Sequence, residues 1–254
     1  MLEPHTDTLI REIFEHADRR FSASAISLTE GQFIHSIVKN HDISSTIEIG
    51  CAHGISSVFI CDALRNRPSP HHVIIDPNQS IEFGSAGLRH LAEANIDFYE
   101  LIEKPSEIAL PQLLEEGCEF DFAFVDGYHT FDHALVDFFY LNRLLRVGGY
   151  LVLDDNNMAA INKVIRYIRT YPAYQLIGTA GRRGFQRRAL NAAKLALATL
   201  VYPITKIAGK SLSHEIFDSS LIRPQSILDL DYSTMVAFQK VAADHRYCDW
   251  YDYF

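Results

Sequence analysis

The chain has 254 residues, of which 48% are hydrophobic and 22% charged. This ordinary globular composition excludes a disordered chain, a collagen-like chain and a small disulfide-stapled protein. The net charge of −9 argues against a nucleic-acid partner, because phosphate contacts need clustered basic side chains. The four cysteines show no metal-site spacing, and the sequence predicts neither a signal peptide nor a membrane-spanning segment. We therefore expect a cytoplasmic protein built on one large domain.

Two helices are expected before residue 42, over residues 6–20 and 28–41. The second has Thr29 at a suitable N-cap position, and its apolar side chains recur at helical spacing. These apolar side chains are Phe33, Ile34, Ile37 and Val38. We interpret residues 1–42 as an N-terminal helical cap.

From residue 45 onward, short β-branched runs alternate with longer helical patterns. The predicted strands are 46–49, 73–75, 98–102, 122–125 and 150–153, and the predicted helices are 55–65, 80–94, 106–116, 131–146 and 157–170. The strand runs lack clean alternation and each is followed by a helix, which is typical of a parallel sheet covered on both faces. The sequence therefore predicts an α/β fold with a doubly wound, mostly parallel, Rossmann-like sheet.

The C-terminal part begins with a predicted sixth strand over residues 174–179, with 184–188 as its hairpin partner. A helix is expected over 189–209, followed by a helical patch near 232–243. We place the boundaries near residues 42 and 181, so that 43–181 form the core and 182–254 form a C-terminal extension with a basic helix.

Acidic side chains recur at the ends of the predicted strands. Glu48 lies in the first strand, Asp76 follows the second, Asp126 the fourth, and Asp154 and Asp155 the fifth. Ligands of open parallel sheets bind in the crevice at the carboxyl ends of the strands. One such acid is adequately explained as a helix cap, but the recurrence at one edge favours a binding site.

The loop after the first strand has the sequence EIGCAHGISS and contains Gly50 and Gly54, which let the backbone approach a ligand closely. Ser56 and Ser57 then open a helix whose N-terminus favours an anion such as a carboxylate. The loop lacks the GxGxxG spacing of a dinucleotide site. It therefore favours a zwitterionic amino-acid group over a nicotinamide dinucleotide.

The order and spacing of six segments resemble the class I S-adenosylmethionine-dependent methyltransferases. The resemblance extends to the small-molecule O-methyltransferases, among them the catechol and caffeoyl-CoA enzymes and metal-dependent sugar methyltransferases. It covers roughly residues 28–180. The segments are TEGQFIHSIVKN, TIEIGCAHGISS, HHVIIDP, KPSEIALPQL, FDFAFVDGYHTFDHALVDF and LLRVGGYLVLDDNN.

The resemblance implies that S-adenosylmethionine is the cofactor, with its methionine part against the first loop. Asp76 would accept its ribose hydroxyls, since a carboxylate has room for both. Pro105 and Ser106 would border the adenine, and Asp126 would lie near the amine. The implied cofactor-binding residues are Glu48, Gly50, Cys51, Ala52, His53, Gly54, Ser56, Ser57, Asp76, Pro105, Ser106 and Asp126.

The resemblance also implies a divalent metal, Mg²⁺ or another cation, held by Asp126 and Asp155. The third ligand is Asp154 in the sugar-enzyme pattern or Asn156 in the catechol-enzyme pattern, and the sequence leaves this open. Such an ion lowers the pKa of an acceptor hydroxyl, and Asp126 or His129 then accepts the proton as the catalytic base. In the alternative interpretation, Asp154 and Asp155 only cap the following helix.

Residues 181–210 carry seven basic side chains and no acid, which leaves a net charge of −16 on the rest of the chain. The basic residues are Arg182, Arg183, Arg187, Arg188, Lys194, Lys206 and Lys210. We favour a helix that packs on the acidic body or forms a homodimer contact. Membrane association is the alternative, less favoured because one short helix binds a membrane weakly.

Together these patterns predict an S-adenosylmethionine-dependent methyltransferase that O-methylates a small-molecule hydroxyl on a sugar or another natural product. Two alternatives are kept, an NAD-dependent Rossmann oxidoreductase and a non-catalytic cofactor-binding protein. The missing GxGxxG motif argues against the first alternative. The intact loop, Asp76 and Asp126 argue against the second.

Overall fold

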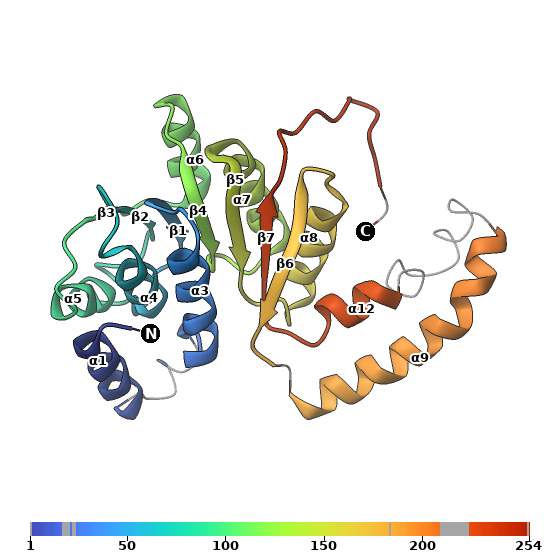
Figure 1. Cartoon of the computed structure of the whole chain (residues 1–254), viewed down its shortest axis with the longest axis horizontal. Helices are drawn as coiled ribbons and strands as arrows, with labels where there is room; N and C mark the ends of the chain where they lie inside the picture. The colour runs from blue at the N-terminus through green and yellow to red at the C-terminus, as the bar shows by residue number, and fades with distance from the viewer. Residues whose placement is uncertain (1, 17–20, 22–23, 183, 209–223, 253) are drawn as a thin grey trace.

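The computed structural model describes residues 2–16, 21, 24–182, 184–208, 224–252 and 254, and these form a seven-stranded sheet with helices on both faces (Figure 1). The strands are β1 (Ser45–Ile49), β2 (His71–Ile75), β3 (Tyr99–Ile102), β4 (Phe120–Val125), β5 (Leu145–Leu153), β6 (Tyr174–Ala180) and β7 (Met235–Lys240). The helices are α1 (Pro4–Glu15), α3 (Leu28–Asn40), α4 (Ile55–Leu64), α5 (Ala86–Glu93), α6 (Ser106–Glu115), α7 (Phe131–Leu144), α8 (Ala159–Thr170), α9 (Phe185–Ala208) and α12 (Pro224–Leu230).

The strand order is β3-β2-β1-β4-β5-β7-β6. Strands β1 to β5 pair in parallel, whereas β7 is antiparallel to both of its neighbours. The register places Ile49 opposite Ile75 and Val125, and Val125 opposite Leu153. The carboxyl ends of four strands are therefore level, and the prediction of a doubly wound, mostly parallel Rossmann-like sheet is confirmed.

Two apolar layers hold the helices against the sheet. Phe122, Phe124 and Val152 lie in the layer shared with α1, α3, α4 and α5. Alternate residues of the same strands, such as Ala123 and Leu151, lie in the layer shared with α6, α7 and α8. Both faces of the central strands are thus buried, which explains why their sequences are continuously apolar.

The N-cap of helix α3 is Ser27, so the prediction of Thr29 as the N-cap is wrong. The Ser27 hydroxyl accepts from the backbone N–H of Glu30, and the Glu30 carboxylate accepts from the backbone N–H of Ser27 at 2.8 Å. This reciprocal capping box satisfies two backbone donors, whereas a cap at Thr29 would have satisfied neither of them.

Two predictions for the C-terminal part are wrong. Residues 235–240 form strand β7 instead of part of a helical patch, because β5 and β6 flank them and bury the apolar side chains on both faces. Residues 184–188 do not return as the hairpin partner of β6, since α9 begins at Phe185 and β6 pairs with β7. At the N-terminus α1 ends at Glu15, and residues 17–20 of the expected helix lie outside the described residues.

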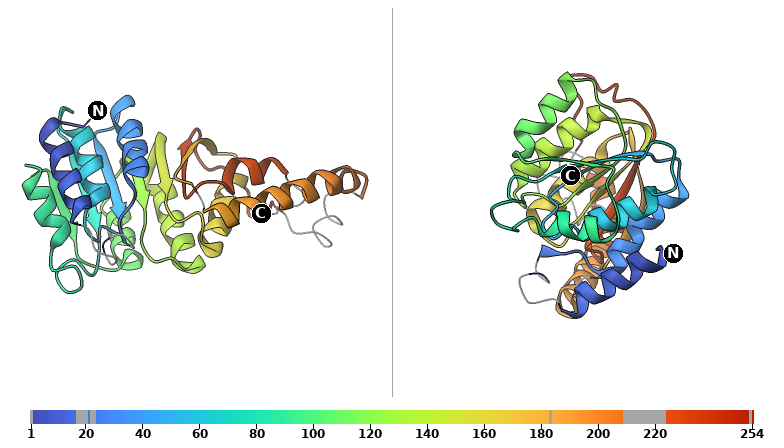
Figure 2. Two further views of the ribbon diagram at one scale, coloured as in Figure 1. Left: turned by 90° about the horizontal axis from the view of Figure 1, so that it is seen from below. Right: turned by 90° about the vertical axis from the view of Figure 1, so that its left-hand side faces the viewer.

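Helix α9 leaves the end of β6 and extends beyond the body of the molecule, with α12 beside its first half (Figure 2). Within the described ranges, none of the helices has both the length and the apolar character required to cross a bilayer.

Candidate active site

A cavity of about 730 Å³ opens at the carboxyl ends of β1, β2, β4 and β5. It is lined by strand ends and by the loops that follow them. The lining residues that the sequence also singled out are Gly50, Ala52, Asp76, Pro105, Ser106, Asp126, His129, Asp154 and Asp155. This is the position at which open α/β sheets bind ligands.

The loop after β1 depends on two glycines. Gly50 has φ +85°, and a Cβ atom there would lie 2.0 Å from the carbonyl oxygen of Asp126. Gly54 has φ +73°, and a Cβ atom there would lie 2.6 Å from Cα of Gly87 in α5. Any larger residue would therefore push the loop away from β4 or from α5, so both positions require glycine.

Asp76 at the end of β2 is buried and fixes this loop. Its Oδ2 atom accepts hydrogen bonds from the backbone N–H groups of Cys51 (3.0 Å) and Ala52 (2.9 Å) and from Nε2 of Gln79 (3.0 Å). Its Oδ1 atom accepts from the backbone N–H of Asn78 at 2.8 Å. A carboxylate oxygen has about two acceptor positions, so Oδ1 keeps one for a ligand hydroxyl.

Six of the predicted cofactor residues do not reach the cavity wall: Glu48, Cys51, His53, Gly54, Ser56 and Ser57. The Ser57 hydroxyl instead donates to the buried carboxylate of Glu48, which also lies 3.2 Å from Nε2 of the buried His72. The His53 ring packs between Phe21 and Phe83. These residues lie on the side of the loop that faces the core. Helix α4, which begins directly after the loop, is buried along its whole length.

The opposite end of the cavity is bordered by Pro105 and Ser106 at the start of α6. Ser106 is hydrogen-bonded to Asp137 of α7, whose side chain is almost fully buried, and this burial raises the pKa of Asp137 to about 6. The sequence analysis missed Asp137. Its signal was an acid on the buried face of a helix, between the core residues Ala134 and Leu141.

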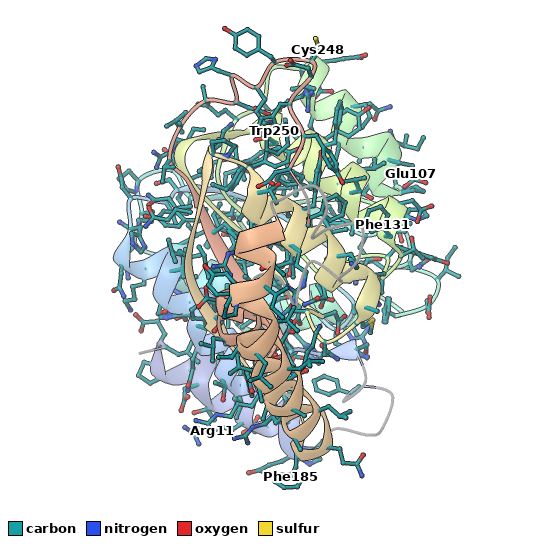
Figure 3. All side chains as sticks on the ribbon, turned by 90° about the vertical axis from the view of Figure 1, so that its right-hand side faces the viewer. Arg11, Glu107, Phe131, Phe185, Cys248 and Trp250 are labelled. Atoms are coloured by element: carbon teal, nitrogen blue, oxygen red, sulfur yellow. The ribbon has the colours of Figure 1, made fainter. Side chains whose placement is uncertain are left out.

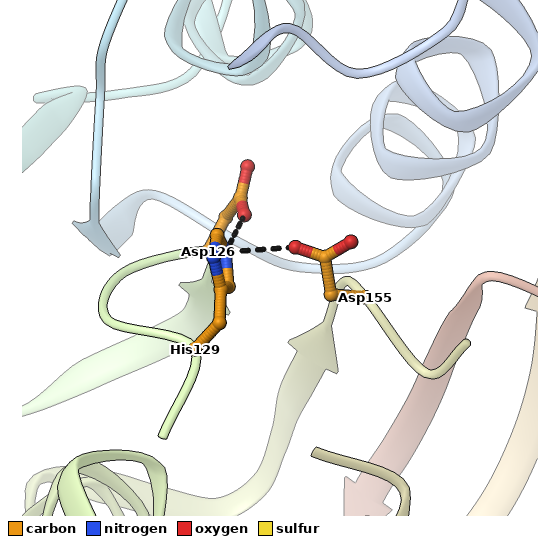
Figure 4. Close-up of side chains that lie close together, drawn as sticks. All are labelled: Asp126, His129 and Asp155. Atoms are coloured by element: carbon orange, nitrogen blue, oxygen red, sulfur yellow. Dashed lines mark hydrogen bonds and ion pairs between the residues drawn. The ribbon is translucent and has the colours of Figure 1, made fainter. Parts of the chain in front are cut away.

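Asp126, His129 and Asp155 come together on one wall of the cavity (Figure 4). The Nε2 atom of His129 lies 3.3 Å from Oδ1 of Asp126 and 2.7 Å from Oδ2 of Asp155. Asp155 has φ +53°, so the chain has already left the strand geometry of β5 at this residue. That turn aims its carboxylate toward β4 and His129.

Asp154 lines the same cavity, and the acids repel one another there. Burial and the nearby Asp126 carboxylate raise the pKa of Asp154, and burial also raises the pKa of Asp126. The hydrogen bonds to Asp126 and Asp155 raise the pKa of His129 to about 10. Three carboxyl groups face one imidazole, so the wall favours a cation.

Asn156, the other candidate for a third metal ligand, is turned away from this wall. Its Nδ2 atom donates to the carbonyl oxygens of Leu230 (2.5 Å) and Ser233 (3.2 Å), and its Oδ1 atom accepts from Nδ2 of Asn162 at 2.7 Å. The Asn156 amide thus joins β5, α8 and the segment before β7, whereas Asp154 stays in the cavity.

The sequence analysis also missed several residues of the cavity. Asn78 and Phe83 lie in the loop after β2, Tyr128 lies in the loop after β4, and His133 lies in the first turn of α7. The Tyr128 ring packs on the His133 ring with 4.9 Å between centroids. Irregular loops carry no periodic pattern, so nothing in the sequence marked these side chains.

Comparison with known proteins places this geometry in a family. Residues 47–156 match a family model described as a methyltransferase domain. Caffeoyl-CoA O-methyltransferase 2 of Petunia hybrida is 30% identical over 193 residues, which cover 66% of this chain and 72% of that protein. Caffeoyl-CoA O-methyltransferase 1 of Eucalyptus globulus is 29% identical over 66% of this chain and 70% of its own. The chain spans 65–72% of the length of such relatives.

Solved structures agree at the level of the fold. The O-methyltransferase of Bacillus cereus in complex with S-adenosylhomocysteine has a TM-score of 0.56 at 18% identity, covering 69% of this chain and 83% of that one. The Streptomyces achromogenes O-methyltransferase TomG, involved in tomaymycin synthesis, has a TM-score of 0.55 at 21% identity, covering 70% and 82%. The oxidoreductase alternative finds no support among these matches. The chain therefore belongs to the class I S-adenosylmethionine-dependent O-methyltransferases.

Proposed function

We propose that this protein transfers the methyl group of S-adenosylmethionine to a hydroxyl of a small molecule, beside Asp126, His129 and Asp155. The observation that carries the proposal is the convergence of these three side chains on the cavity that Gly50, Asp76 and Ser106 also line. The relatives named as O-methyltransferases support the same reaction class.

The acidic wall matches the charge of the cofactor. S-adenosylmethionine carries a sulfonium and an ammonium group. The carboxylates of Asp126 and Asp155 line the cavity, together with the carboxyl group of Asp154, whose pKa is raised to about 9 by burial. Its ribose would lie toward Asp76 and its adenine toward Pro105 and Ser106. Positioning the acceptor oxygen in line behind the methyl carbon is then a large part of catalysis.

In the reaction, the acceptor oxygen forms a bond to the methyl carbon while the carbon–sulfur bond breaks, and the hydroxyl loses its proton. His129 holds a proton between Asp126 and Asp155, so the adjacent carboxylate is the better proton acceptor. Burial raises the pKa of Asp126 to about 6, which makes it a stronger base than an exposed aspartate. His129 balances the negative charge and orients that carboxylate.

The same wall fits a divalent cation. One nitrogen of His129 and one oxygen each of Asp126 and Asp155 lie within 4.8 Å of one another, and the carboxyl group of Asp154 also lines the cavity. Binding of the ion would displace the proton that His129 holds, because only a neutral imidazole is a ligand. When bound, such an ion would lower the pKa of the acceptor hydroxyl. An imidazole among the ligands favours an ion such as Mn²⁺ over Mg²⁺, which prefers oxygen alone.

Two measurements test this proposal. Calorimetric titration should show binding of S-adenosylhomocysteine and no binding of NAD; the reverse result would contradict the assigned cofactor. Turnover with excess chelator, followed by addition of Mn²⁺ or Mg²⁺, tests the metal separately. We expect activity to fall with the chelator and to return preferentially with Mn²⁺. Full activity in chelator would refute the metal requirement and leave the methyl transfer itself intact.

We propose further that the protein acts in the cytoplasm. Its four cysteines are all free thiols, and Cys51 and Cys61 are buried in the core. Reduced thiols are the normal state of that compartment. The protein, purified from its own cells, can be labelled with a thiol reagent in the native and in the unfolded state. All four cysteines should react after unfolding, and the buried Cys51 and Cys61 should not react before it. Fewer than four reactive thiols after unfolding would contradict the reduced state.

A further inference from the structure

Within the described part of the chain, one face of helix α9 is buried, and α12 packs beside it. Asn191, Ala198 and Thr205 recur every seven residues on this face and are buried. The Asn191 amide donates to the backbone carbonyl of Asp231, just beyond α12. These contacts tie α9 to the molecule and fix which side of the helix faces outward.

The opposite face of α9 is an exposed apolar stripe, defined here as Leu190, Leu197, Leu200 and Ile204. Their exposed fractions are 61%, 50%, 74% and 58%. The alanines at 189, 193 and 196 fill the space between them, so the stripe holds no charged side chain. Phe185, 82% exposed, stands at the start of the helix and points away from the body (Figure 3).

Basic side chains lie around the stripe. Arg182 precedes the helix and Arg188 lies in its first turn, and both side chains are exposed. Lys194 lies beside the stripe, and its Nζ atom is 3.9 Å from Oδ2 of Asp231. Arg183 and Lys210 lie outside the described residues. Because residues 181–210 carry +7 without any acid, a face with exposed leucines is combined here with a strongly positive local charge.

This combination decides between the candidate partners. If two copies paired through their stripes, two segments of charge +7 would lie side by side and repel each other. The acidic body of a second copy would attract the charge but would not need an apolar face. An anionic lipid surface satisfies both features, since its headgroups attract the basic flanks and its acyl region takes up the leucines.

We propose that α9 lies on an anionic membrane surface, with the apolar stripe inserted at the headgroup boundary and the basic side chains among the lipid phosphates. A single amphipathic helix of this kind gives reversible binding. This inference is independent of the methyl-transfer reaction, because the stripe includes no residue of the cavity.

The test is cosedimentation of the full-length protein with vesicles of phosphatidylcholine alone and of phosphatidylcholine with phosphatidylserine. We expect binding to the anionic vesicles only, and loss of most of it when salt is raised from about 0.1 M to about 0.5 M. The double variant Leu197→Glu/Leu200→Glu should reduce binding at least about tenfold. Arg182→Gln/Arg188→Gln should weaken it and also reduce its salt dependence.

The matched control is Val147→Glu, which adds a carboxylate at an exposed valine near the start of β5, outside α9. It should bind vesicles like the wild type. Circular dichroism and light scattering of every variant separate loss of binding from unfolding. Absence of vesicle binding would overturn the proposal. This holds for a monomeric wild type, and also for a dimeric wild type that the Leu197→Glu/Leu200→Glu variant dissociates, since the stripe would then be a dimer contact. Equal binding to neutral vesicles would overturn it as well.

Discussion

At the residue scale, the Asp76 carboxylate has two roles. It accepts hydrogen bonds from the loop after β1, and it lines the cavity. We predict that Asp76→Asn weakens S-adenosylhomocysteine binding by about 1.5–3 kcal/mol, the scale of a hydrogen bond to a charged group. Calorimetry measures this directly. Asp97→Asn, at an exposed acid away from the cavity, is the control. Wild-type affinity in Asp76→Asn would remove this residue from the cofactor site.

Asp137 gives a pH-dependent prediction. Its pKa is raised to about 6 by burial, so the folded protein keeps a proton that the unfolded chain releases near pH 4. Wild-type stability therefore falls as pH rises from about 4 to about 6, and the penalty is complete above that range. Asp137→Asn removes the charge while keeping an oxygen acceptor for Ser106.

The variant should raise the free energy of unfolding at pH 7.5 by about 1–3 kcal/mol, and by much less at pH 4.5. Urea denaturation at both pH values measures the difference. A variant that is less stable than the wild type at pH 7.5, or one with the same gain at both pH values, would show that the buried carboxylate is not the source of the penalty.

The sequence marked the acids of the candidate site because each stands at the end of a strand. Asp126 and Asp155 fulfil the prediction that the ends of neighbouring strands bring their carboxylates together. Asp137 and Tyr128 were not marked. The first lies within a helix, and the second depends on the path of a loop, which local sequence does not determine.

At the scale of single elements, the contact between α3 and α4 is set by one glycine. A Cβ atom on Gly31 would lie 2.2 Å from the ring of Phe59, which is fully buried. We predict that Gly31→Ala lowers the free energy of unfolding by about 1–3 kcal/mol, because overpacking outweighs the gain in helix propensity.

The control is Gln32→Ala, which introduces alanine at the next position of α3, where the side chain is exposed. It should change stability by less than about 0.5 kcal/mol. Chemical denaturation of both variants provides the comparison. If Gly31→Ala were as stable as the wild type, the two helices would have room to separate, and the close contact at Phe59 would not limit their packing.

Elements with a strong local pattern were predictable. The β-branched runs of β1 and β2 and the amphipathic pattern of α8 each produce the expected structure. Strand β7 was not predictable, since its residues become a strand only through pairing with β5 and β6. The same holds for the N-cap of α3, where Ser27 and Thr29 both suit the position locally.

At the scale of the whole molecule, the C-terminal extension contributes a strand to the central sheet. Strand β7 comes from this extension and lies between β5 and the edge strand β6. Helix α9 follows β6 after a short turn, and its other end extends beyond the sheet (Figures 1 and 2). Helix α12 lies beside the first half of α9 (Figure 2), and Asp231, just after α12, lies 3.9 Å from Lys194 of α9.

The most direct test of the central claim is formation of S-adenosylhomocysteine from S-adenosylmethionine with a panel of small hydroxyl acceptors, including catechols, phenylpropanoid thioesters and sugars. We predict acceptor-dependent product formation by the wild type, and a fall of at least about a hundredfold in Asp155→Asn with cofactor binding retained. Binding of S-adenosylmethionine without turnover on any hydroxyl acceptor, or undiminished turnover in Asp155→Asn, would contradict the assigned site.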